Sequence, residues 1–86
     1  MNEVKEVAHV RGHILRVALD NGMCADIDLS SYPEKGPIFA PLADIGFFKR
    51  VSIEGGTLAW PNGADISPER IFELVAHANK AMLPTR

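Results

Sequence analysis

The chain has 86 residues, of which 47% are hydrophobic and 23% are charged, and this composition is typical of a single compact globular domain. Its formal net charge of −2 argues against a strongly basic surface for nucleic acid or for an anionic membrane. One cysteine cannot close an intramolecular disulfide, and the N-terminal residues lack the apolar run of a signal peptide. We therefore expect one cytoplasmic domain over residues 1–86, with no segment that crosses a membrane.

Residues 13–29 predict a β-hairpin, because apolar residues alternate on both sides of an Asn-Gly pair. A two-residue loop would place Asp26 opposite Val17 and mix carboxylates into the apolar face. A three-residue loop at 20–22 pairs Val17 with Ala25 instead, and Gly22 can adopt the left-handed conformation that such a loop needs. We predict the three-residue loop, with residues 4–10 as a further strand that ends before a break at Gly12.

Residues 49–62 predict a second hairpin, this time with a two-residue Gly55-Gly56 loop. This loop pairs Ile53 with Leu58 and directs Trp60 toward the core. Between the hairpins, residues 41–44 have room for about one helical turn, which we expect Gly46 to end.

The segment WPNGADISPE, residues 60–69, combines signals for the end of a strand, a turn and the start of a helix. Pro61 cannot donate to a strand ladder, and Ser67 followed by Pro68 is a typical helix start. We predict a helix from Pro68 to Met82, limited by Pro84. Its apolar face is expected to consist of Ile71, Leu74, Val75, Ala78 and Met82.

Together these elements predict an α+β fold. We expect a small antiparallel sheet of about five strands, built from the two hairpins and the N-terminal strand, with the C-terminal helix packed on one face.

Three stretches of the sequence resemble a known family: LRVALDNGMCADIDL, GPIFAPLADIGFFKRVSI and GGTLAWPNGADISPERIFEL. The chain resembles, over nearly its whole length, the small bacterial family named domain of unknown function 2442, and WPNGADISPE is the most specific part. The resemblance implies a small α+β domain and offers no catalytic residues to transfer. It also implies a neighbouring small protein, in an arrangement similar to toxin–antitoxin pairs. Some members carry a helix-turn-helix region after this domain, which we do not expect here because the chain ends at Arg86.

The residues that could carry chemistry form no recognised pattern. Cys24 has no surrounding motif of a nucleophile, and the hairpin register makes it a packing residue opposite Ala18. The histidines His9, His13 and His77 lack the spacing of a metal site, and the glycine pairs lack the spacing of a phosphate-binding loop. We therefore predict no catalytic, cofactor-binding or metal-binding residue.

Several apolar residues lie outside the predicted core: Tyr32, Ile38, Phe39, Phe47, Phe48, Phe72 and Leu83. They either form a satellite cluster beneath the long loop or remain exposed as a protein interface, and the sequence favours neither. The candidate interaction surface consists of Phe39, Phe47, Phe48, Lys49, Arg50 and Phe72.

We expect a non-enzymatic protein-interaction or regulatory domain, acting as an antitoxin-like partner of a small protein. A domain of this size buries only about 60–65% of its surface, so a homodimer interface would stabilise it. One alternative is a nucleic-acid-associated regulator that uses Lys49 and Arg50, which two positive charges do not favour. Another is a small enzyme that uses Cys24.

Overall fold

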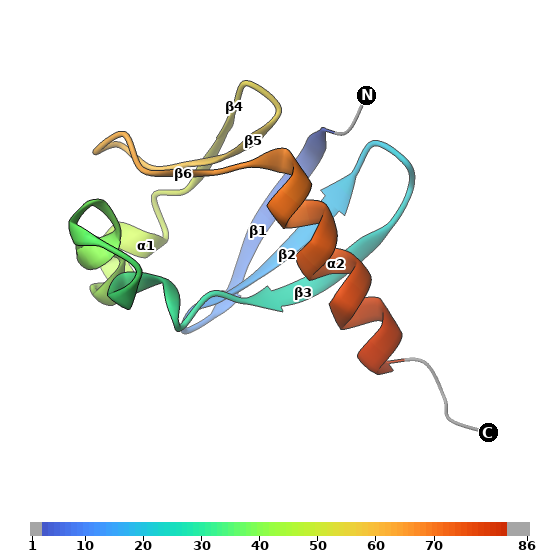
Figure 1. Ribbon diagram of the computed structural model, residues 1–86, viewed down its shortest axis with the longest axis horizontal. Coiled ribbons are helices and arrows are strands. Elements are labelled where there is room, and N and C mark those ends of the chain that lie inside the picture. Colours follow the sequence, from blue (N-terminus) through green and yellow to red (C-terminus); the bar gives the residue numbers. More distant parts are fainter. Residues whose placement is uncertain (1–2, 83–86) are drawn as a thin grey trace.

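The computed structural model describes residues 3–82, with side chains as far as Asn79, and shows an α+β fold with two separate sheets (Figure 1). Sheet A contains β1 (Val4–Arg11), β2 (Ile14–Leu19) and β3 (Cys24–Asp28), in that order. Sheet B contains β4 (Ser52–Glu54), β5 (Thr57–Ala59) and β6 (Asp65–Ile66), and α2 (Pro68–Met82) follows it. The α+β class is confirmed, but the expected single sheet of about five strands is wrong.

The hairpin of β2 and β3 has the predicted three-residue loop. Val17 pairs with Ala25, and the N–H of Leu19 donates to the carbonyl of Met23 at 2.8 Å. Gly22 has a φ of 91°, the left-handed conformation that the loop requires. β1 pairs with β2 on its other side, which confirms the N-terminal strand.

The hairpin of β4 and β5 has the predicted two-residue loop, since Ile53 pairs with Leu58. Trp60 is confirmed as a core residue and is only 3% exposed. The chain does not leave the sheet at Pro61, however. It turns at residues 61–63 and returns as β6, so that Leu58 also pairs with Ile66. The prediction of a simple strand end at Pro61 missed this third strand.

A long segment without strands joins the two sheets. It contains two 3₁₀ helices, η1 (Tyr32–Glu34) and η2 (Pro37–Ala43), and a short helix α1 (Ile45–Phe48). Gly46 does not end a helix there as expected. Its N–H instead donates to the side chain of Asp44 at 3.1 Å, and this carboxylate caps the start of α1. We call residues 37–50 the connector.

The helix α2 has the predicted bounds, and the N–H of Arg70 donates to the hydroxyl of Ser67 at 3.2 Å. Its residues Ile71 and Val75 are fully buried against the core, as predicted, and α2 lies against β3. Pro84 and the side chain of Met82, which belong to the same prediction, lie outside the described residues, and so does Leu83, one of the apolar residues outside the predicted core.

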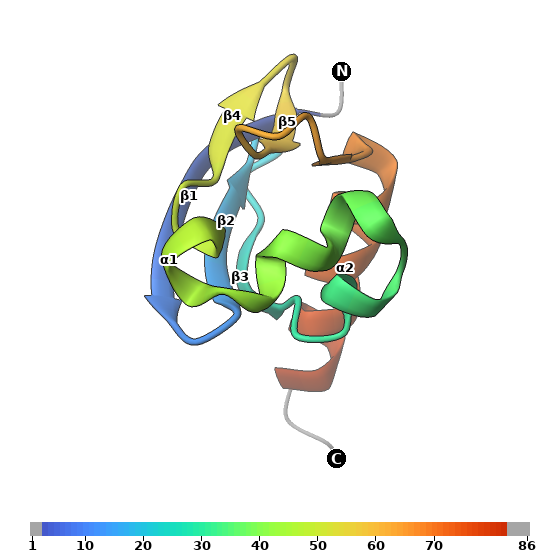
Figure 2. The same cartoon turned by 90° about the vertical axis from the view of Figure 1, so that its left-hand side faces the viewer.

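The core fills the space enclosed by sheet A, sheet B, α2 and the connector (Figure 2). Its largest fully buried side chains come from all of these parts: Leu15, Val17, Leu29, Leu42, Phe48, Leu58, Ile71 and Val75. The two sheets are joined at one corner, where the N–H of Val4 donates to the carbonyl of Gly56 at 2.8 Å. A contact at one turn is not a strand ladder, and so the sheets remain separate.

Candidate interaction surface

Three side chains from the two sheets hold the connector by its backbone. His13, in the turn after β1, donates from Nε2 to the carbonyl of Leu42 at 2.6 Å. Asn62, in the turn after β5, donates from Nδ2 to the carbonyl of Ile38 at 2.9 Å. Trp60 donates from Nε1 to the carbonyl of Phe48, also at 2.9 Å. The connector is therefore fixed near its start, in its middle and near its end.

These contacts matter because η2 and α1 are short helices that satisfy few of their own carbonyl groups. An external donor to each carbonyl holds a segment that its own helical hydrogen bonds would hold weakly. Within the connector, the side chains of Leu42 and Phe48 point inward and are fully buried, which fixes its inner side. The outer side is therefore presented on a rigid frame.

The exposed residues of η2, in the first half of the connector, are apolar. Ile38 is 48% exposed, and among residues 3–79, whose side chains are described, it is the one large hydrophobic residue that is neither buried nor half-buried. Its neighbours in η2, Pro37, Ala40 and Pro41, are also exposed, as is Pro61 beside Asn62. We call these five residues the Ile38 surface.

The six residues of the predicted interaction surface divide into three groups: four exposed or half-buried residues of the connector, the buried Phe48, and Phe72 on α2. Phe39 and Phe47 are half-buried on η2 and α1, and Lys49 is exposed after α1. Arg50 is also exposed, with its guanidinium carbon 6.0 Å from the centre of the Phe47 ring. These four residues belong to the connector.

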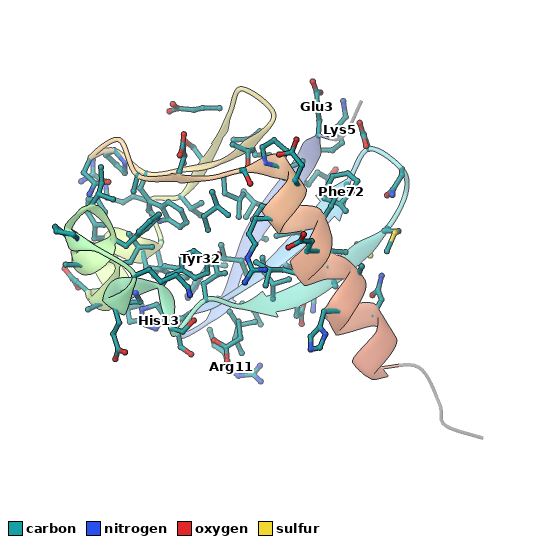
Figure 3. All side chains as sticks on the ribbon, in the orientation of Figure 1. Glu3, Lys5, Arg11, His13, Tyr32 and Phe72 are labelled. Carbon is teal, nitrogen blue, oxygen red and sulfur yellow. The ribbon has the colours of Figure 1, made fainter. Side chains whose placement is uncertain are left out.

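Phe48 and Phe72 do not share a surface with the other predicted residues. Phe48 is fully buried, with its ring centre 4.8 Å from that of His13 and 5.9 Å from that of Trp60. Phe72 is half-buried on α2, near the β2–β3 turn and away from α1 (Figure 3). Phe48 is thus a core residue, and neither it nor Phe72 extends the connector surface.

The two readings of the extra apolar residues each hold for part of the set. Tyr32 is buried and packs edge-on against Phe39, with ring centres 5.5 Å apart. Tyr32 and Phe48 therefore join the core, whereas Ile38 remains exposed. The sequence gives no signal for this division, because η2 has two prolines and no periodic pattern that would separate an inner from an outer side.

Cys24 lies opposite Ala18 as predicted, but it is exposed rather than packed. It lines a shallow hollow of about 210 Å³ on the outer face of sheet A, together with Glu6, Val7, Ala8, Arg16 and Ala18. Next to this hollow, Arg16 donates to both carboxylate oxygens of Asp26, at 2.7 and 3.2 Å. This hydrogen bonding lowers the pKa of Asp26 below its ordinary value of 3.8.

The remaining candidate groups are dispersed. His9 and His13 each use Nε2 to contact a backbone carbonyl, of Gly12 and Leu42, and His77 is exposed on α2. Within residues 3–82, no three side chains of the metal-binding types come together. The described part of the chain also contains no helix with the length and apolar character needed to span a membrane.

The comparisons with known proteins give one match. The family model described as protein of unknown function (DUF2442) matches residues 4–77. No curated protein and no solved structure matches the chain.

Proposed function

The chain belongs to the DUF2442 family of proteins of unknown function, and we propose that it acts as a protein-interaction domain. In this proposal the Ile38 surface binds the partner, and the two sheets and α2 are the scaffold that holds it. The domain then works by binding and needs no catalytic group of its own.

The observation that carries the proposal is an exposed isoleucine on a fixed backbone. Ile38 is 48% exposed although its own carbonyl accepts a hydrogen bond from Asn62 at 2.9 Å. Exposed apolar surface on a segment that is already ordered binds with a smaller entropic cost than the same surface on a flexible loop. The neighbouring prolines restrict the backbone further.

We propose as partner a small protein encoded beside this chain, in an antitoxin-like or other regulatory pair. The Ile38 surface fits a partner with a complementary apolar patch, because Pro37, Ala40, Pro41 and Pro61 are, like Ile38, exposed and uncharged. Lys49 and Arg50 are exposed at the other end of the connector, and in this proposal they set the orientation of the partner.

The experiment is to co-express the chain with the product of the adjacent gene and to purify the pair through a tag on one of them. We expect wild type to retain the partner and Ile38→Asp to lose it, because a carboxylate at the centre of an apolar contact is desolvated on binding. Ala76→Asp is the matched control, since Ala76 is exposed on α2, away from the connector.

The two variants separate a specific contact from a general loss of folding. Both substitutions are at exposed positions, so both variants should unfold at nearly the wild-type urea concentration. Failure of the adjacent gene product to co-purify with wild type, or its equal retention by Ile38→Asp, would contradict the proposal.

A further inference from the structure

The free edge of sheet A and the end of α2 form a second place where another chain can dock. β3 is the last strand in the order β1-β2-β3, so only one of its edges is paired among the described residues. The opposite edge of the sheet is different, because β1 lies against β4 and β5. β3 therefore has the long open edge of the molecule, with five residues from Cys24 to Asp28.

The direction of its backbone groups follows from the hairpin register. Met23 and Leu29 bond toward the β2 side of the hairpin, since the N–H of Leu19 donates to the carbonyl of Met23 at 2.8 Å and the N–H of Leu29 donates to the carbonyl of His13, the residue before β2, at 2.9 Å. Partners alternate along an antiparallel strand. Cys24, Asp26 and Asp28 consequently direct their N–H and C=O groups toward the open edge.

The helix α2 extends over this edge. In Figures 1 and 2 its C-terminal half continues past β3, on the side away from β2. Along the apolar face of α2, Val75 is fully buried, whereas Ala78, about one turn further on, is only half-buried. The apolar face of α2 thus extends beyond the sheet that covers its first half.

A strand added to β3 would lie on the side of the sheet edge over which α2 continues. Strands lie about 4.8 Å apart, and their side chains alternate between the two faces. On the inner face, the side chains of an added strand would lie beside Ala25 and Ile27, on the side of sheet A that α2 covers and where Leu74 and Ala78 are half-buried. Those positions suit aliphatic residues.

On the outer face, the added strand would lie beside Asp26 and Asp28. The pKa of Asp26 is lowered by its hydrogen bond with Arg16, and the pKa of Asp28 is lowered by hydrogen bonds from Ser30, so both are ionised at neutral pH. Opposite charges on neighbouring strands attract, and like charges repel. Arg16 already pairs with Asp26, whereas Asp28 forms no ion pair among the described residues, so the outer position beside Asp28 suits lysine or arginine.

We propose that β3 accepts a β-strand from a partner polypeptide in which basic and aliphatic residues alternate. A second copy of this chain is the wrong occupant, because pairing two β3 strands about a two-fold axis brings Asp26 and Asp28 of one copy beside those of the other. This site does not depend on the Ile38 surface, which is formed by η2 and Pro61.

The test uses the isotope-labelled chain and two short peptides, one alternating lysine with valine and the other alternating glutamate with valine. We expect the lysine peptide to shift the amide signals of Cys24, Asp26, Asp28 and the second half of α2, and the glutamate peptide to leave them unchanged. Added salt should weaken the lysine complex. The lysine peptide should also slow alkylation of the exposed Cys24 thiol.

Variants at Cys24 sharpen the test, because Cys24 lies on the outer face of the open edge. Cys24→Lys should weaken the lysine peptide about threefold and Cys24→Glu should strengthen it by a similar factor, as cross-strand charge pairs do. Ser52→Lys, with the same added charge on an exposed position of β4, should leave binding unchanged.

Three results would overturn the proposal. The first is equal binding of both peptides, or of neither. The second is a set of shifted signals outside β3 and α2. The third is concentration-dependent self-association through β3 without any peptide, which would make a second copy the occupant.

Discussion

The turn that joins β2 to β3 and the turn that joins β5 to β6 have the same local structure. Each has Asn-Gly at its last two positions, and the glycines have φ values of 91° and 93°. Each asparagine accepts a hydrogen bond at Oδ1 from the N–H two residues later, at 2.9 Å for Asn21 and 3.1 Å for Asn62. The chain thus uses one turn twice.

The two turns differ in what they connect. The first joins two strands of five and six residues, and its asparagine side chain has one partner in the structure. The second joins strands of three and two residues, and Asn62 also donates to the carbonyl of Ile38 in the connector. The same turn therefore serves only to reverse the chain in sheet A, whereas in sheet B it also fixes the proposed interaction surface.

The largest expected losses of stability come from replacing the core residue that precedes each turn. Leu19 and Trp60 are 4% and 3% exposed, and both belong to the core. We expect Leu19→Ala to cost about 2–5 kcal/mol of unfolding free energy and Trp60→Ala to cost about 3–5 kcal/mol. Trp60→Ala should be the more damaging, because it also removes the donor to the carbonyl of Phe48. Urea unfolding of both variants measures this order, and the reverse order would contradict the role of Trp60.

The next largest loss of stability should come from replacing the turn glycines, and it should be equal in the two turns. Gly22 and Gly63 have no atom within 4 Å of the position that a Cβ would take, so an alanine at either meets only backbone strain. We expect Gly22→Ala and Gly63→Ala to cost about 1–2 kcal/mol each. Denaturation midpoints that differ widely between the two variants would show that the turns are not equivalent.

A smaller effect should separate the two asparagines. Replacement by aspartate keeps the oxygen that accepts the turn hydrogen bond and removes the donor. Asn21→Asp should therefore change stability by less than about 0.5 kcal/mol, and Asn62→Asp should cost about 1 kcal/mol through loss of the contact with Ile38. Thermal unfolding of the pair provides the comparison. Equal changes in both variants would mean that Asn62 does not hold the connector.

The smallest expected effect is the pH dependence of the first hairpin, where Arg16 and Asp26 pair across the strands. Because the pKa of Asp26 is lower in the folded chain, its stabilising contribution is complete above the ordinary value of 3.8 and is lost as the pH falls through the folded value. Asp26→Asn should make the urea midpoint less sensitive to pH in this acidic range. An unchanged acid dependence would exclude a contribution from the pair.

The sequence predicted those parts of the fold in which a pattern repeats. The strands of the first hairpin are long enough for the alternation of Val17, Ala25 and their neighbours to select one loop length. The helix α2 has a cap at Ser67 and an apolar face over several turns. In the hairpin several residues indicate the same strand register, and in α2 several residues indicate the same buried face.

The features of the fold that the sequence did not predict lack a repeating pattern of apolar residues. β6 has two residues and follows Pro61, which cannot donate to a strand ladder, so neither periodicity nor composition marked it as a strand. Gly46 looked like the end of a helix because the cap at Asp44 depends on a local conformation that the sequence leaves open. The pairing of apolar faces also cannot tell whether two hairpins share one sheet, since that depends on the hydrogen bonds between their edges.

The same limit applies to the proposed interaction surface. The aromatic residues of the connector were recognised as candidates, but whether each points inward depends on contacts far apart in sequence. Phe48 is buried where Trp60 and His13 pack against it, and the backbone of the exposed Ile38 is held by Asn62. Neither contact is visible in the local sequence.

Backbone ¹⁵N relaxation of the isolated chain tests most directly whether the connector is a rigid surface held by the two sheets. If His13, Asn62 and Trp60 hold it as described, the order parameters of Ile38, Phe39 and Leu42 should be near 0.85, about the value of rigid strands. Values below about 0.6 at these residues would show a flexible loop and would contradict the account.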